Sequence, residues 1–178
     1  MTSYKIKGII LTSKAFFESD KLLDCFTTQY GKIKCLAKSA QKTTSQFGGK
    51  CDPFTLIEGV IYSGKSFNIL SQVSLVHSYS NLRLDFNKLQ LALFYLKVIT
   101  LSTDYNQKNN ELYTLLITQL NILDQSTNIE TAKKEFFKQF LSTEGLLESN
   151  KKEISEKEFI KILSEYTNKF ITPPLHLK

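Results

Sequence analysis

The chain has 178 residues, of which 42% are apolar and 22% are charged. This length and composition suffice for one globular core or two small ones, and they exclude fibrous, collagen-like and wholly disordered proteins. The 23 basic and 17 acidic residues give a formal net charge of +6, which favours a polyanionic partner. Residues 1–80 contain 10 lysines and 5 acids, a net charge of +5, so most of the excess lies in this part.

The first 80 residues show the alternation of apolar and polar side chains that is typical of β-strands. Turn residues at 29–31 and 63–66 predict two tight hairpins, because glycine supplies the positive φ that such turns need. A long loop at 39–53 separates the third strand from the fourth. This layout predicts a small closed barrel of the OB-fold type, forming a domain over residues 1–80. The predicted strands cover residues 4–12, 21–27, 32–38, 55–62 and 67–76.

From about residue 82 the apolar period changes to 3.6, which predicts helices. Ser155 and Glu158 form a capping box that starts the last helix, and Pro173 and Pro174 end it. The fold class is therefore α+β in two parts, with a helical domain over residues 81–178. The predicted helices cover 85–102, 109–123, 129–141 and about 155–170, with a polar loop at 148–153. The first is expected to bury a stripe of Leu89, Leu93, Leu96, Ile99 and Thr100.

Residues that could carry catalysis are scarce. His77 and His176 have no patterned nucleophile, carboxylate or ligand neighbour, and no phosphate-binding loop motif is present. Cys25, Cys35 and Cys51 lack metal-ligand spacing, and we expect them to be small buried side chains. The sequence therefore predicts a protein that is not an enzyme, with no cofactor and no metal. It shows neither a signal peptide nor a membrane span, so we expect a soluble cytosolic protein.

The most informative short segment is the lysine-rich strand at residues 32–38. Alternation turns its apolar side chains inward and its lysines outward, with about 6.6–7 Å per two residues, a spacing comparable to that of phosphates along one strand. The following loop adds two lysines with an aromatic residue between them. Lysines on the backbone and an aromatic ring on a base are how OB-folds bind single strands. The predicted nucleic-acid site is Lys32, Lys34, Lys38, Lys42, Lys50 and Phe47; the alternative is a solvated surface whose lysines serve solubility.

Two further groups of aromatic residues have two interpretations each. Phe16, Phe17 and Tyr30 are candidates for base stacking, although most aromatic side chains of a small barrel pack in its core. An aromatic cluster in the helical half is expected to be packed core, and the alternative is a groove that accepts a partner's short apolar tail. The residues of that partner-binding alternative are Phe136, Phe137 and Phe140, with Lys133, Lys134 and Lys138 beside them.

Six motifs follow one another along the first half: YKIKGIIL (4–11), ESDKLL (18–23), FTTQYGKI (26–33), LAKSA (36–40), SQFGG (45–49) and DPF (52–54). In order and spacing they resemble the RecO family, and FLSTEGLL (140–147) resembles the end of a helix in that family. The resemblance implies an OB-fold followed by helices, binding to single- and double-stranded DNA, and annealing of complementary strands. It also implies partnership with RecR and the single-stranded-DNA-binding protein, so that RecA is loaded, in the bacterial cytoplasm at the nucleoid.

The chain also departs from the family that it resembles. Many members carry a four-cysteine zinc site in the helical domain, whereas this chain has no cysteine after Cys51, so no zinc is expected. The family tends to have glycine where Ser39 stands, and arginine where Gln41 and Gln46 stand, and each arginine lost removes a phosphate contact. Lys38 and Lys42 match the family and carry over as DNA contacts.

The resulting hypothesis is a DNA repair and recombination mediator whose barrel binds DNA and whose helical domain docks a protein partner. The near-neutral helical half and the missing arginines suggest an alternative, an adaptor that contacts DNA only through its partners. The OB-fold equally allows an RNA-binding protein.

Overall fold

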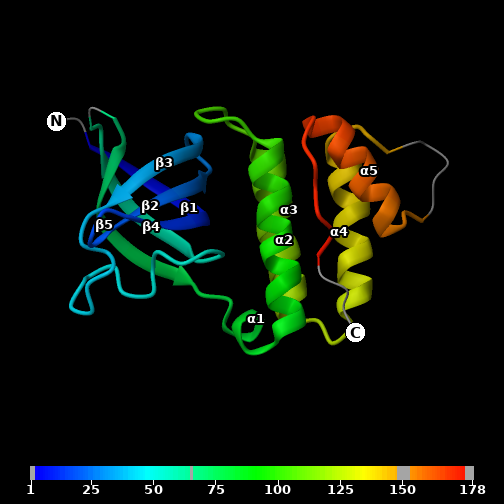
Figure 1. Cartoon of the computed structure of the whole chain (residues 1–178), viewed down its shortest axis with the longest axis horizontal. Helices are drawn as coiled ribbons and strands as arrows, with labels where there is room; N and C mark the ends of the chain where they lie inside the picture. Colours follow the sequence, from blue (N-terminus) through cyan, green and yellow to red (C-terminus); the bar gives the residue numbers. More distant parts are fainter. Residues whose placement is uncertain (1–2, 65, 148–152, 175–178) are drawn as a thin grey trace. The chain divides into compact units, whose positions relative to one another are not determined.

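The computed structural model describes residues 3–64, 66–147 and 153–174, and it divides the chain into two compact units. One consists of Met1–Ser78 and Thr103–Asn110, and we call it the barrel unit. The other, the helical unit, consists of Tyr79–Ser102 and Glu111–Lys178. Figure 1 labels the elements of both. Residues 103–110, which the sequence assigned to the helical domain, therefore belong with the barrel.

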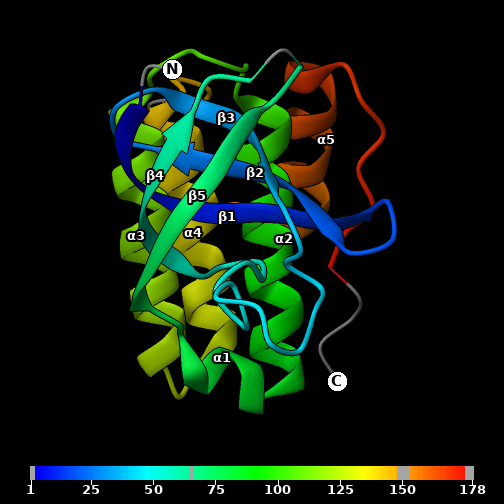
Figure 2. The same cartoon turned by 90° about the vertical axis from the view of Figure 1, so that its left-hand side faces the viewer.

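The barrel unit is the predicted OB-fold, a closed five-stranded barrel in the order β1-β2-β3-β5-β4. β3 pairs with β5 in parallel, whereas β1 pairs antiparallel with both β2 and β4. Figure 2 shows β4 and β5 crossing in front of the other three strands. A bulge between Ile10 and Thr12 bends β1, which continues beyond its predicted end. The strands are β1 (Ser3–Phe16), β2 (Asp20–Thr27), β3 (Gly31–Ala37), β4 (Leu56–Tyr62) and β5 (Asn68–His77).

Inward-facing side chains of all five strands form the barrel core, as the alternation predicted. The three cysteines are free and buried in this core. Burial raises the pKa of the Cys51 thiol to about 11. A hydrogen bond with Cys35, followed by burial, raises the pKa of Cys25. The Cys25 and Cys51 thiols therefore stay protonated at neutral pH and act as small apolar side chains.

The long loop between β3 and β4 closes one end of the barrel, where Figure 2 shows it in cyan. Ala40, Phe47 and Cys51 of this loop lie in the barrel core. The Ser39 N–H donates to Asp20 Oδ1 at 2.7 Å, which ties the loop to the β1–β2 hairpin. Core packing and hydrogen bonds therefore fix the loop to the barrel.

Residues 103–110, which connect two helices along the sequence, pack against the start of β3. The Asn106 N–H donates to the Lys32 carbonyl at 2.8 Å, and Lys32 also forms a parallel bridge with Tyr105. A Cβ atom on Gly31 would lie 1.8 Å from the Gln107 carbonyl oxygen, and Gly31 has a φ of +68°. Glycine is thus required at this position both by conformation and by the close approach of the connecting segment.

The helical unit contains helices α1 to α5, packed around aromatic side chains. Tyr95 stacks on Phe136 with ring centroids 3.7 Å apart, and Phe137 stacks on Phe159 at 4.1 Å. The Asp124 carboxylate, buried at the end of α3, accepts a hydrogen bond at 3.0 Å from the Leu82 N–H at the start of α1. The helices are α1 (Ser80–Leu84), α2 (Phe86–Ser102), α3 (Asn110–Gln125), α4 (Ile129–Thr143) and α5 (Glu156–Thr167).

The four predicted helices are confirmed, and three details differ. The short α1 was not predicted. The stripe expected on α2 is confirmed at Leu96 and Ile99 and wrong at Leu93, which is exposed. Leu91, Ala92 and Val98 are buried as well, so α2 buries most of its circumference. α5 ends before its predicted limit, since Asn168 takes a left-handed conformation and leaves Phe170 exposed.

Two remaining sequence interpretations concern the later part of the chain. Of the loop expected at 148–153, residues 148–152 lie outside the described residues, as does His176. None of the helices in the described part has the length and apolar character needed to cross a membrane.

Replacing Gly31 with alanine tests the docking of residues 103–110. Gly49 is the matched control, because its φ is +66° and nothing lies within 4 Å of the added Cβ. Gly49→Ala should cost about 1–2 kcal/mol for the left-handed backbone alone. Gly31→Ala should cost clearly more and should make residues 103–110 sensitive to proteases, as measured by thermal unfolding and limited proteolysis. Equal losses in the two variants would contradict this packing.

Candidate nucleic-acid interface

The outer face of β1, β2 and β3 carries the predicted basic strand. Thr12, Asp24 and Lys34 lie in one row across the three strands, as their pairing register requires. The next row contains Leu22 and Leu36, both partly exposed. This face therefore combines charged and apolar side chains, a mixture suited to a nucleic-acid strand.

Three predicted site lysines lie on or beside this face with their ammonium groups accessible. Lys38 follows β3 directly and is exposed, Lys42 is exposed in the next loop, and Lys34 is partly exposed. Within the described residues, Lys38 and Lys42 form no ion pair. Lys50 is partly exposed, and its ammonium donates to the Gln46 carbonyl at 2.9 Å.

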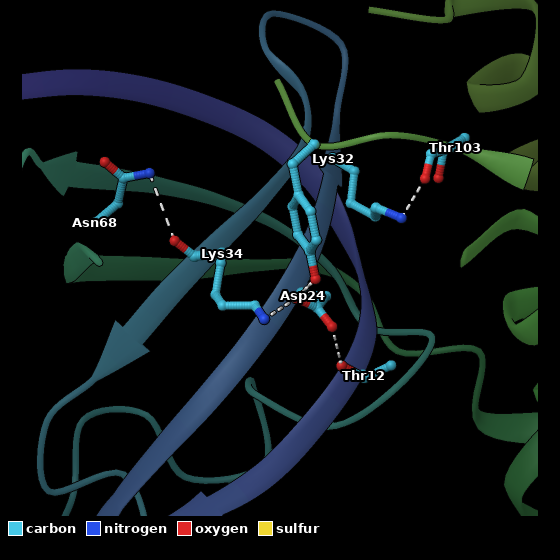
Figure 3. Close-up of polar contacts among 7 residues, drawn as sticks. Thr12, Asp24, Lys32, Lys34, Asn68 and Thr103 are labelled. Atoms are coloured by element: carbon cyan, nitrogen blue, oxygen red, sulfur yellow. Dashed lines mark hydrogen bonds and ion pairs between the residues drawn. The ribbon is translucent and has the colours of Figure 1, made fainter. Parts of the chain in front are cut away.

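Lys32 does not join these lysines, because it lies on the outer face as predicted but is not exposed there. It is only 5% exposed, and its ammonium donates to the Thr103 carbonyl (Figure 3). The reason is the docking of residues 103–110, which covers the start of β3. Alternation along a strand assigns a side chain to a face, and it does not show which other segment covers that face.

Asp24 is the polar centre of the outer face. Its carboxylate accepts hydrogen bonds from the Thr12 hydroxyl at 2.8 Å and the Tyr105 hydroxyl at 2.7 Å. It also lies 3.9 Å from the Lys34 ammonium (Figure 3). Asp24 therefore fixes the Thr12 and Tyr105 side chains by hydrogen bonds. Its negative charge offsets part of the positive charge of Lys34.

Tyr105 is a residue of this surface that the sequence interpretation missed. The Lys32 and Lys34 ammonium groups lie 4.7 Å and 5.0 Å from the centroid of its ring, and the residue is 42% exposed. Burial of the hydroxyl, followed by its bond to Asp24, raises the pKa of Tyr105. No local signal marks this tyrosine, because it lies in the helical half of the sequence and reaches the barrel only through the tertiary fold.

Among the aromatic side chains of the barrel, the prediction is wrong for Phe47. Phe47 is 4% exposed in the barrel core, so it cannot present its ring to a base without leaving that core. Phe16 contacts Phe17 at 4.4 Å and Phe67 at 5.8 Å between ring centroids. Phe17 is 80% exposed. An accessible aromatic row thus exists on the barrel, made by Phe16, Phe17 and Phe67 instead of by Phe47.

A cavity of about 300 Å³ adjoins this row. Phe67 lines it from the β4–β5 connection, Asn68 from the start of β5, Tyr105 and Asn106 from residues 103–110, and Lys34 from β3. Aromatic, amide and ammonium groups therefore converge on one hollow at the edge of the basic face.

Gln41 and Gln46 stand where the resemblance led us to expect arginine. The Gln41 amide donates to the Asp20 carbonyl at 2.7 Å, and the Gln46 amide donates to the Ser71 carbonyl at 3.1 Å. Both side chains thus fasten the β3–β4 loop to the barrel. They stabilise the scaffold and add no positive charge to it.

The candidate partner groove on α4 is packed core. Phe136, Phe137 and Phe140 are buried, which agrees with the core interpretation and removes them from an accessible groove. Lys133 is also buried, with ion pairs of 2.8 Å to Glu130 and Glu156. Burial lowers the pKa of Lys133, but its bonds to Glu130 and Glu156 outweigh burial and raise the pKa overall. Of this set, Lys134 and Lys138 are exposed.

Among the described residues, no cluster of three or more His, Cys, Asp or Glu side chains could hold a metal ion. Within the same described residues, no histidine lies on the basic face, since His77 is the exposed last residue of β5. Beside the Asp24 carboxylate, this surface presents ammonium, amide and aromatic groups, which can bind and stack.

Comparisons with known proteins agree with the barrel fold of the first part of the chain. Residues 1–79 match the family model described as Recombination protein O N terminal. The chain is 32% identical over 132 residues to a DNA repair protein RecO from Caldanaerobacter subterraneus, covering 74% of this chain and 53% of that protein. It is 30% identical over 143 residues to the DNA repair protein RecO of Clostridium kluyveri, covering 80% and 56%. The chain thus spans about half the length of the curated relatives that it matches.

Replacing Lys32 with methionine tests its structural role. The Thr103 carbonyl would lose a buried donor, so we expect a loss of about 1–3 kcal/mol in stability. Lys42→Met is the control, since an exposed position should change stability by less than about 0.5 kcal/mol. Urea unfolding of the two variants decides the matter, and equal midpoints would mean that Lys32 is a surface residue.

Proposed function

Through its first 79 residues the chain belongs to the RecO family, and on this premise we propose that it is a non-catalytic DNA-binding protein of DNA repair and recombination. Its barrel binds single and double strands by their phosphates, with little sequence preference. The observation that carries this proposal is the basic outer face of β3 and the following loop. Lys34, Lys38 and Lys42 lie there, and two of them are without an opposing carboxylate in the described residues.

The number of phosphate contacts is expected to be modest. Lys32 is buried, Lys21 pairs with Asp52 at 3.0 Å, and Lys34 shares Asp24 with Tyr105. Exposed Lys14 on β1 adds one further positive group to the barrel. Three to five contacts correspond to a slope of about −2 to −3.5 in a plot of log affinity against log salt, at about −0.7 per phosphate on a single strand.

Strand annealing follows from the same charges. Two complementary strands repel each other, and a lysine surface lowers that repulsion while raising their local concentration. Neither step needs a nucleotide, zinc or another cofactor. We extend the proposal to RecR and the single-stranded-DNA-binding protein as partners of the helical unit, and to RecA loading as the outcome. Because Phe136, Phe137 and Phe140 of α4 are buried in the core, we expect these partners to contact exposed residues of the helical unit such as Lys134.

An adaptor without direct DNA binding is the second candidate. The burial of Lys32 and Phe47 favours it, because both were counted as DNA contacts. Affinity for RecR or for the acidic tail of the single-strand binder, together with no affinity for naked DNA, would select the adaptor. Competition between RNA and DNA oligomers of one sequence would separate the RNA-binding alternative.

Charge reversal of the basic face tests the proposal directly. The triple variant Lys34→Glu, Lys38→Glu and Lys42→Glu should weaken binding to a labelled strand of roughly 30 nucleotides and flatten the salt slope by about 2, at about 0.7 per lost contact. The matched control reverses Lys138, Lys161 and Lys169, which are exposed in the helical unit and change the net charge equally. Fluorescence anisotropy at several salt concentrations measures both variants.

The control removes the effect of overall charge. Binding that weakens equally in both triple variants, or in neither, would show that the face of β3 is not the DNA site. Absence of binding by the unmodified chain, even at low salt, would favour the adaptor.

A further inference from the structure

The cavity beside Lys34 lies where three separate parts of the barrel unit meet. β3 provides Lys34, the end of the β4–β5 connection and the first residue of β5 provide Phe67 and Asn68, and residues 103–110 provide Tyr105 and Asn106. Its volume of about 300 Å³ is at the lower limit for small-ligand pockets. A pocket of this size can hold one flat group, whereas a duplex is too wide to enter it.

The side chains that line the cavity match the parts of a single nucleotide. The Tyr105 ring can stack on a base, and the Asn106 side chain and the free donor and acceptor atoms of Asn68 can meet the polar edge of that base. One N–H of the Asn68 amide donates to the Lys34 carbonyl (Figure 3), in a long contact of 3.5 Å. A lysine at the rim suits the adjoining phosphate.

Tyr105 is prepared for this role by its surroundings. Its hydroxyl is fixed to Asp24 at 2.7 Å, and its backbone segment is bridged to Lys32, so the ring has a set orientation before any ligand arrives. A pre-oriented ring loses little conformational entropy on binding. The Lys34 ammonium lies 5.0 Å from the centre of this ring. By rotating about its side-chain bonds, Lys34 can move this ammonium from the ring to a phosphate.

We propose that this cavity binds one unpaired base of a nucleic-acid strand, stacked on Tyr105, and that the base takes the place of the Lys34 ammonium over the ring while that ammonium moves to the phosphate. This inference rests on the proposed function and adds a selectivity to it. Bases in a duplex are already paired and stacked, so the pocket favours single strands over double strands. The aromatic row that ends at Phe67 gives neighbouring bases a path toward the pocket.

The chain contains no tryptophan, so a single introduced one reports on its own position. Tyr105→Trp keeps an aromatic surface in the pocket, and its emission should be quenched when a base stacks on it. The probes are an oligothymidylate strand and an abasic strand of the same length and charge. Tyr166→Trp is the matched control, because Tyr166 is 43% exposed and lies in the helical unit.

We expect the thymine strand to quench Tyr105→Trp, and the abasic strand to bind without quenching it. The Tyr166→Trp control should respond equally to both strands. Tyr105→Ala should lower the affinity of the thymine strand about 5- to 150-fold, which corresponds to about 1–3 kcal/mol per stacked base. Its affinity for the abasic strand and for duplex DNA should remain that of the unmodified chain.

The possible failures are distinguishable. An unmodified chain that binds none of the strands overturns the proposed function. An unmodified chain that binds both strands, with Tyr105→Trp equally bright in both complexes, overturns the base pocket and leaves phosphate binding intact. Equal losses of Tyr105→Ala on thymine and abasic strands also overturn the pocket, because they would reflect a general effect on the barrel. Circular dichroism and thermal unfolding of each variant verify that the barrel is folded.

Discussion

The contact between residues 103–110 and the start of β3 is the interaction on which the surface of the barrel depends. The Lys32 ammonium reaches the Thr103 carbonyl, the Asn106 N–H bonds to the Lys32 carbonyl, and Gly31 leaves room for the Gln107 backbone. A buried ammonium is tolerated only with good acceptors, so this lysine holds the connecting segment firmly. Without the segment, Lys32 would be exposed and the barrel would lack Tyr105.

This contact also divides the lysines of the first half into structural and accessible groups. Lys32 is structural, whereas Lys38 and Lys42 remain in solvent. Lys34 is intermediate, because Asp24 lies 3.9 Å away and the Tyr105 ring lies beneath its ammonium. Fewer positive groups can therefore contact a phosphate backbone than the net charge of +5 over residues 1–80 suggests. Affinity on such a surface depends on a few exposed ammonium groups together with stacking.

The two aromatic clusters of the chain illustrate how burial separates structure from binding. On α4, Phe136, Phe137 and Phe140 pack against Tyr95 and Phe159, and they stabilise the helical unit by removing a large apolar area from water. On the barrel, Phe16 and Phe17 lie at the rim with rings that water reaches. Aromatic side chains of this second kind are the ones that can exchange water for bases.

The sequence by itself determined the five strands, the main helices, the inward cysteines and the family resemblance. Apolar periods of 2 and 3.6 report which side of a strand or helix is buried, and Ser155 with Glu158 reports a helix start, so these features are written locally. Only the tertiary structure decided that Lys32 is covered and Phe47 lies in the core, that α2 is buried around most of its circumference, and that Tyr105 faces Lys34. Each of these depends on a contact between residues distant in sequence, and no local period encodes which segment will cover a given face.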